Sequence, residues 1–78
     1  MADVIFYWRP GCGFCAALER QLVRRDVGFE KRNIWEDPDA AAFVRSVARG
    51  TETVPTLVVK ERSFVNPSID DVLEALAS

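Results

Sequence analysis

The sequence contains no histidine and carries almost no net charge. Histidine is the commonest general base and the commonest metal ligand, so its absence removes the usual route to acid–base catalysis and to a metal site. The formal net charge is −2, which gives a nucleic-acid partner no electrostatic support. We therefore expect no bound metal and no nucleic-acid partner.

Long apolar stretches are also lacking. No segment approaches the ~20 apolar residues of a membrane span. The first apolar run covers only residues 4–8, without the basic start and longer apolar region of a secretory signal peptide. We expect a cytoplasmic protein without a membrane partner. Thiols are kept reduced in that compartment, so a permanent disulfide is not expected.

The chain is 78 residues long with 49% hydrophobic residues, enough for a globular core in one domain. We expect a single domain over residues 1–78, because no linker, repeat or low-complexity segment divides it. A chain this short buries only about 60% of its unfolded surface, so modest stability is expected.

Local patterns predict strands and helices in alternation. Residues 4–8 are β-branched and aromatic, which predicts a strand buried on both faces. A helix should follow Gly11 and close at Gly28, and residues 29–34 form a weaker strand candidate. The buried stripe of this first helix should contain Cys15, Leu18 and Leu22.

The second half of the sequence predicts another helix, two strands and a final helix. The second helix should begin at Asp37-Pro38 and end at Gly50. Strands are expected at 56–59 and 63–65, joined by a tight turn that lacks the usual Gly. Asn66-Pro67-Ser68 should open the last helix, whose apolar stripe is Ile69, Val72, Leu73 and Leu76. The order β-α-β-α-β-β-α predicts a parallel β-α-β unit followed by an antiparallel hairpin.

The most informative motif is Cys12-Gly13-Phe14-Cys15, which lies between the first strand and the first helix. A thiol at a helix start faces unpaired backbone N–H groups and the positive end of the helix dipole, and both stabilise a thiolate. Arg9 adds a nearby cation. We expect such surroundings to lower the pKa of Cys12. Cys12 should be the exposed attacking thiol and Cys15 the shielded resolving thiol.

Three other interpretations of the cysteine pair stay open on the residues alone. A structural disulfide would close a very short loop and stabilise little. A zinc site needs four ligands as a rule, and one pair without histidine supplies two. The cysteines could be ordinary core residues, although Pro10-Gly11 and Gly13 favour an exposed turn. The surrounding β-α-β pattern favours the redox interpretation.

With these motifs in place, the chain resembles the glutaredoxin class of the thioredoxin fold over almost its whole length. The resemblance is carried by residues 9–15, by Thr53-Val54-Pro55-Thr56 and by the order of elements. It implies an α/β fold with a four-stranded mixed sheet flanked by three helices. It also implies a cis Val54–Pro55 bond facing the cysteines. Under this resemblance the catalytic residues are Cys12 and Cys15, and the thiol-binding residues are Arg9, Phe14, Thr53, Val54 and Pro55.

The glutaredoxin clamp for the glutamyl end of glutathione is a Gly-Gly-x-Asp motif, and residues 64–71 lack the glycine pair. The pattern is similar to the actinobacterial mycoredoxins, which reduce mixed disulfides between proteins and mycothiol. That resemblance implies reduction through Cys12 alone in a monomer, with protein disulfides as partners. The small thiol, mycothiol, is then a co-substrate, and no metal or organic cofactor is needed. A dithiol electron donor to ribonucleotide reductase or a peroxidase is an alternative. A glutaredoxin that binds a [2Fe–2S] cluster between two chains is another, which Gly13 after the first cysteine permits.

Two tryptophans near the motif have less certain roles. Trp8 is interpreted as a core aromatic at a strand end rather than as a cover for the site. Trp35 is interpreted in the same way, and Arg9 is either a thiolate partner or a solvated surface charge.

Overall fold

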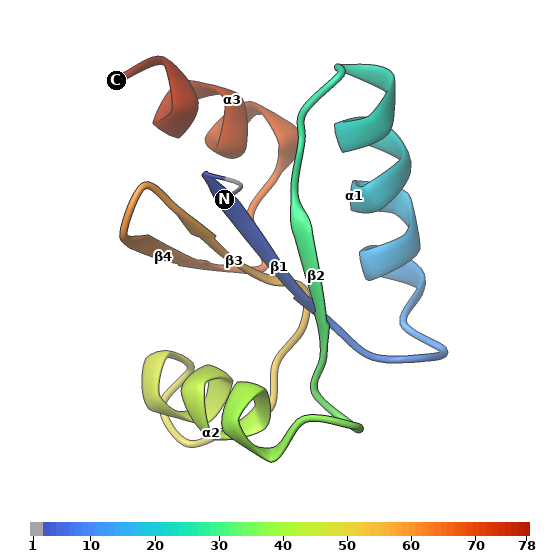
Figure 1. The fold of residues 1–78 in the computed structure, drawn as a ribbon, viewed down its shortest axis with the longest axis vertical. Helices are drawn as coiled ribbons and strands as arrows, with labels where there is room; N and C mark the ends of the chain where they lie inside the picture. Colours follow the sequence, from blue (N-terminus) through green and yellow to red (C-terminus); the bar gives the residue numbers. More distant parts are fainter. Residues whose placement is uncertain (1–2) are drawn as a thin grey trace.

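The computed structural model describes residues 3–78. The expectation that the chain lacks a secretory signal peptide concerns Met1 and Ala2 as well, and these two residues lie outside the described range. The chain folds into a four-stranded sheet with helices on both faces, as Figure 1 shows. The α/β architecture expected from the sequence is therefore confirmed.

The sheet is mixed, and its strand order is β2-β1-β3-β4. Strand β1 (Val4–Trp8) pairs in parallel with β2 (Glu30–Asn33) and antiparallel with β3 (Thr56–Val59). Strand β4 (Arg62–Val65) completes an antiparallel hairpin with β3. The parallel β-α-β unit and the hairpin both form as predicted, although β2 is shorter than the expected 29–34.

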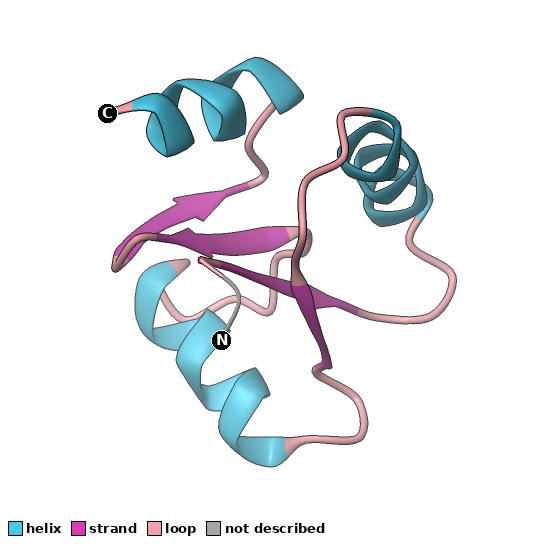
Figure 2. Cartoon of the chain, turned by 45° about the horizontal axis from the view of Figure 1, so that its top comes forward, coloured by secondary structure: helices cyan, strands magenta, loops and turns pink. Residues whose placement is uncertain are grey.

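Three helices cover the sheet. Helices α1 (Gly13–Arg24) and α3 (Ile69–Ala77) lie on one face and α2 (Pro38–Val47) on the other, which is clearest in Figure 2. The two helical layers make β1 a strand covered on both sides. Among residues 3–78, no helix is both long enough and apolar enough to span a bilayer.

Alternate residues of β1 enter two separate cores. Val4 and Phe6 are fully buried beneath α1 and α3, together with Leu22 and Leu57. On the opposite face, Tyr7 packs in a second cluster with the apolar side of α2. The prediction of a strand buried on both faces is confirmed, because successive side chains of a strand point to opposite sides of the sheet.

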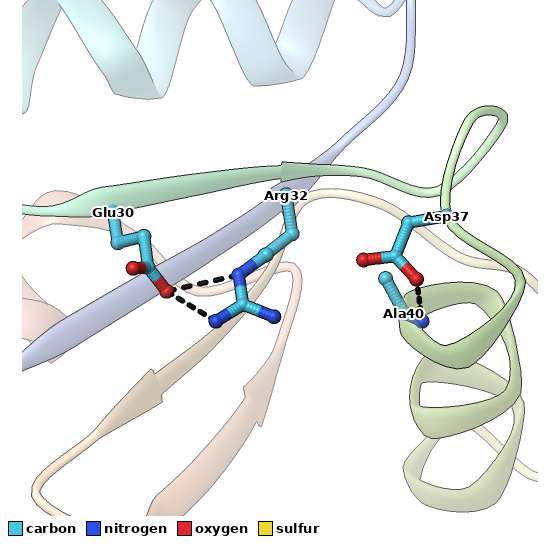
Figure 3. Close-up of polar contacts among 4 residues, drawn as sticks. All are labelled: Glu30, Arg32, Asp37 and Ala40. Atoms are coloured by element: carbon cyan, nitrogen blue, oxygen red, sulfur yellow. Dashed lines mark hydrogen bonds and ion pairs between the residues drawn. The ribbon is translucent and has the colours of Figure 1, made fainter.

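Each helix begins with a side-chain cap. The carboxylate of Asp37 accepts hydrogen bonds from the backbone N–H groups of Asp39 (3.1 Å) and Ala40 (3.2 Å), the second of which is drawn in Figure 3. Ser68 and Asp71 form a capping box at α3, with reciprocal bonds of 3.1 and 3.0 Å. Cys12 caps α1 through its sulfur, at 3.1 Å from Cys15 N.

Several predicted boundaries and burials are wrong. Helix α1 ends at Arg24 rather than at Gly28, because Asp26 already adopts a left-handed conformation (φ 59°) and Val27 N–H bonds back to Leu22 O at 2.9 Å. In α3, Ile69, Leu73 and Leu76 are only partly buried. Ala75 is buried instead, because the face of this short helix that carries Val72 and Ala75 is the one that packs against the sheet.

Helix α2 ends at Val47, before the predicted Gly50, and Arg49 already adopts a left-handed conformation (φ 58°). Gly50 follows in the same region (φ 89°), and its N–H bonds to Arg45 O at 2.8 Å. The β3–β4 turn is as tight as expected. Lys60 (φ 49°) and Glu61 (φ 72°) both take left-handed conformations that glycine normally supplies.

Candidate active site

Cys12 lies where the loop after β1 becomes helix α1. Its own backbone is extended, with φ −90° and ψ 105°, while its carbonyl accepts the helix bond from Ala16 N at 3.1 Å. Gly11 just before it has φ 78°, which places the turn in a region that glycine favours. The local sequence thus turns the chain sharply at the thiol and starts the helix there.

The two cysteines occupy different environments, as the spacing predicted. Cys12 is half-buried, whereas Cys15 is only 2% exposed and belongs to the core beneath α1. The pair is joined as a disulfide, with the Cα atoms 5.2 Å apart. An incoming thiol or disulfide therefore has access to the sulfur of Cys12 and not to that of Cys15.

The start of α1 is arranged to hold negative charge on Cys12. The sulfur of Cys12 accepts the Cys15 N–H at 3.1 Å, and the first turn of the helix carries no acidic residue. In the reduced protein the same N–H and the helix dipole would stabilise a thiolate. The lowered pKa of Cys12 stays a prediction.

A second segment approaches the sulfur from the loop before β3. The Val54–Pro55 peptide bond is cis, as expected, and Val54 O lies 3.8 Å from Cys12 Sγ. Pro55 is buried, and Val54 packs against both core clusters. The structure thus brings the motifs at 12–15 and 53–56 together, although they are about forty residues apart in the sequence.

Hydrogen bonds from two residues that the sequence did not single out as site residues hold this segment. The buried hydroxyl of Thr56 donates to Thr53 O at 2.8 Å, and Asn66 N–H donates to Pro55 O at 2.8 Å. Thr53 itself is fixed through its hydroxyl, 2.7 Å from that of Thr51. The only sequence signal for Asn66 is its type, because Asn tolerates the left-handed conformation that it adopts here (φ 51°).

The contacts described for Arg9 are with Pro10 and Trp35 rather than with a cysteine sulfur. One guanidinium N–H donates to Pro10 O at 3.1 Å, and the guanidinium carbon lies 5.5 Å from the centre of the Trp35 ring. Trp35 is 63% exposed, so its interpretation as a core aromatic is wrong. Its position in the turn after β2 leaves no layer of the fold to cover it.

The two other aromatic residues near the motif differ in exposure. Phe14, in the first turn of α1, is 74% exposed. Trp8 is half-buried against the core under α1, and Lys31 Nζ lies 4.4 Å from the centre of its ring while pairing with Glu19 at 3.1 Å. The interpretation of Trp8 as a packed aromatic at a strand end fits these contacts.

The thiol site can now be set beside known proteins. The glutaredoxin sequence family matches residues 4–65, which include both cysteines and the cis-proline segment. This chain belongs to the glutaredoxin family. A glutaredoxin of Mycobacterium tuberculosis, found in two strains, is 35% identical over 72 residues, which cover 91% of this chain and 86% of that protein. This chain is accordingly a thiol–disulfide oxidoreductase with a Cys-x-x-Cys pair.

Solved structures agree with the fold. The thioredoxin-like protein BC3987 superposes with a TM-score of 0.81 at 19% identity, over 94% of this chain and 99% of that one. The glutaredoxin-like protein NrdH-redoxin from Escherichia coli has a TM-score of 0.78 at 27% identity, over 91% of each chain. The expected thioredoxin fold of the glutaredoxin type is confirmed.

Proposed function

We propose that this glutaredoxin reduces mixed disulfides between proteins and a low-molecular-weight thiol, mycothiol, through Cys12. The observation that carries the proposal is the asymmetry of the pair: a reachable Cys12 sulfur at a helix start, 3.1 Å from Cys15 N, beside a shielded Cys15. Family membership supplies the reaction class, and the protein partners follow from it.

The reaction balances without a resident cofactor. The Cys12 thiolate attacks the small thiol's sulfur in the mixed disulfide, and the protein thiolate leaves and takes up a proton. A second small thiol, as thiolate, attacks the Cys12 adduct, which releases the symmetric small-thiol disulfide and restores Cys12. The Cys15 thiolate competes by attacking the Cys12 sulfur of this adduct, which expels the small thiol as its thiolate and closes the Cys12–Cys15 disulfide. We place this chemistry in a cytoplasmic monomer.

The choice of mycothiol is supported by the segment between β4 and α3. Residues 64–71, which match the place of the family's glutathione clamp, contain no glycine pair, and they include Asn66 and the buried Pro67. A proline has no N–H to donate and fills the space that a glycine would leave open. Mycothiol has no glutamyl group and does not need the clamp. The mycobacterial relative, which matches 91% of this chain, is described as a glutaredoxin and so supports the reaction class rather than the choice of thiol.

A second candidate is a dithiol electron donor that delivers electrons from a flavoprotein reductase through both cysteines. The bonded Cys12–Cys15 pair is compatible with either scheme, and one observation favours this one: the similar Escherichia coli protein is described by its thioredoxin-like activity profile. In this scheme the disulfide is the resting oxidised product rather than a side product.

The deciding experiment compares three electron routes on one protein substrate. The substrate is prepared with mycothiol or with glutathione on the same cysteine, and each form is reduced with its own thiol and reductase. In a third arm the same substrate is reduced with thioredoxin reductase as the only electron source, without a small thiol. The proposal expects the fastest turnover in the mycothiol arm. Fastest reduction in the third arm would favour the dithiol donor, and fastest reduction of the glutathione form would refute mycothiol.

A further inference from the structure

Two loops meet at the edge of the sheet where the cysteines lie. Strands β1 and β2 are parallel, so the loops that follow them leave the sheet at the same end. The pairing extends beyond β2, because Ile34 N–H donates to Trp8 O at 2.9 Å. The loop to Cys12 therefore begins beside the turn that contains Trp35.

Trp35 and Arg9 stand together in the two loops at this edge of the sheet, and the pair is called the rim below. The Arg9 guanidinium lies over the Trp35 ring, and its Nη1 lies 3.9 Å from the position that a Cβ on Gly11 would occupy. Gly11 directly precedes Cys12. The Arg9 end of the rim therefore lies against the residue next to Cys12, where a bulky group attached to the Cys12 sulfur can meet it.

The rim combines an apolar ring face with hydrogen-bond donors. An exposed fraction of 63% leaves much of the Trp35 ring open to solvent. The guanidinium has five N–H groups, and the contact described for it uses one of them, with Pro10 O. Glu36 and Asp37 follow Trp35 directly, so the turn itself carries two acidic residues, which disfavour an anionic ligand. This combination suits a neutral polyhydroxylated ring better than a carboxylate-rich peptide.

We propose that Trp35, with Arg9 stacked on it, is the specificity platform for the polyhydroxylated rings of the small thiol. The C–H face of such a ring packs on the part of the indole that Arg9 leaves exposed, and hydroxyl groups at its edge accept from the guanidinium. This inference rests on the proposed function and adds the residue that selects the thiol. Trp35 acts in binding and not in the exchange of sulfurs.

The test measures KM and kcat of wild type, Trp35→Ala, Trp35→Phe and the control Val23→Ala on three disulfides. These are one peptide carrying mycothiol, the same peptide carrying glutathione, and bis(2-hydroxyethyl) disulfide, which has no ring. Val23 is also exposed but lies in the last turn of α1, remote from Cys12. Trp35→Ala should raise KM about tenfold for the mycothiol peptide only, as loss of an aromatic stacking contact does, with kcat unchanged. Trp35→Phe should keep most of the affinity.

Equal losses on all three disulfides, or an unchanged KM for the mycothiol peptide, would overturn the platform. A similar loss in Val23→Ala would do the same. Failure of the proposed function is visible separately, in the wild type: no preference for the mycothiol peptide over the glutathione peptide refutes that function and the platform with it.

Discussion

Thr56→Val tests how the segment opposite Cys12 is held. The substitution keeps the β-branched shape of the residue and removes its hydroxyl, which is fully buried and donates to Thr53 O at 2.8 Å. That bond ties strand β3 to the peptide group just before Val54, whose carbonyl lies 3.8 Å from Cys12 Sγ. Without it, the Thr53–Val54 peptide should lose its fixed orientation toward the sulfur.

The expected magnitude follows from one hydrogen bond. Its loss costs about 0.5–1.5 kcal/mol of unfolding free energy, since the half-buried Thr53 carbonyl can regain water. For a domain of this size, about 1 kcal/mol lowers Tm by roughly 4–8 °C. If the same energy is lost from the transition state, kcat/KM falls by at most about tenfold.

Thr56→Ser separates positioning from stability. It keeps the hydroxyl and deletes a methyl group, which costs about 0.8 kcal/mol, so both variants should melt at similar temperatures. Thermal melts of the reduced protein and steady-state kinetics are measured on both. Serine should retain wild-type KM while valine does not. Equal kinetics in two equally destabilised variants would refute the positioning argument.

The remaining predictions concern the hairpin turn and Tyr7. Glu61→Gly should raise Tm by a few degrees, because relief of a left-handed non-glycine residue (about 1–2 kcal/mol) exceeds the entropy cost of glycine (about 0.5–1 kcal/mol). Lys60→Gly should give no such gain, since Lys60 Nζ donates to Leu76 O and Ser78 O at the end of α3. A Glu61→Gly variant that is less stable than wild type would contradict the turn geometry. Burial raises the pKa of Tyr7, and the nearby Arg32 guanidinium lowers it by a smaller amount. Arg32 is itself paired with Glu30, as Figure 3 shows. The folded protein therefore holds this proton more tightly, and urea melts should show stability falling as pH rises above about 10, with less loss in Tyr7→Phe. The single tyrosine makes tyrosinate absorbance a direct check, and ionisation at the ordinary pKa would contradict the burial.

The sequence predicted what depends on local periodicity and on a recognisable motif. The strand at 4–8, the Asp37-Pro38 helix start and the cysteine pair all follow from short patterns, and the structure confirms them. Helix ends were harder, because Asp26 supplied the left-handed residue expected at Gly28. Several residues can fill that role, and only tertiary contacts decide among them.

The arrangement around Cys12 was only partly predictable. The resemblance indicated Val54 and Pro55, but it gave no reason to choose Thr56 or Asn66, whose bonds depend on how β3 and β4 pair. The contact of Arg9 with Trp35 was also missed. It arises because parallel pairing places the ends of β1 and β2 together, and no local pattern contains that information.

The most direct test of the account is a comparison of Cys12→Ser with Cys15→Ser in the reduction of a mycothiolated protein. Cys12 presents the accessible sulfur at the helix start, and Cys15 is shielded in the core. The account predicts that Cys12→Ser abolishes turnover while Cys15→Ser retains much of it, with a Cys12–mycothiol adduct visible by mass spectrometry. Equal loss of activity in both variants would contradict the monothiol mechanism and favour the dithiol donor.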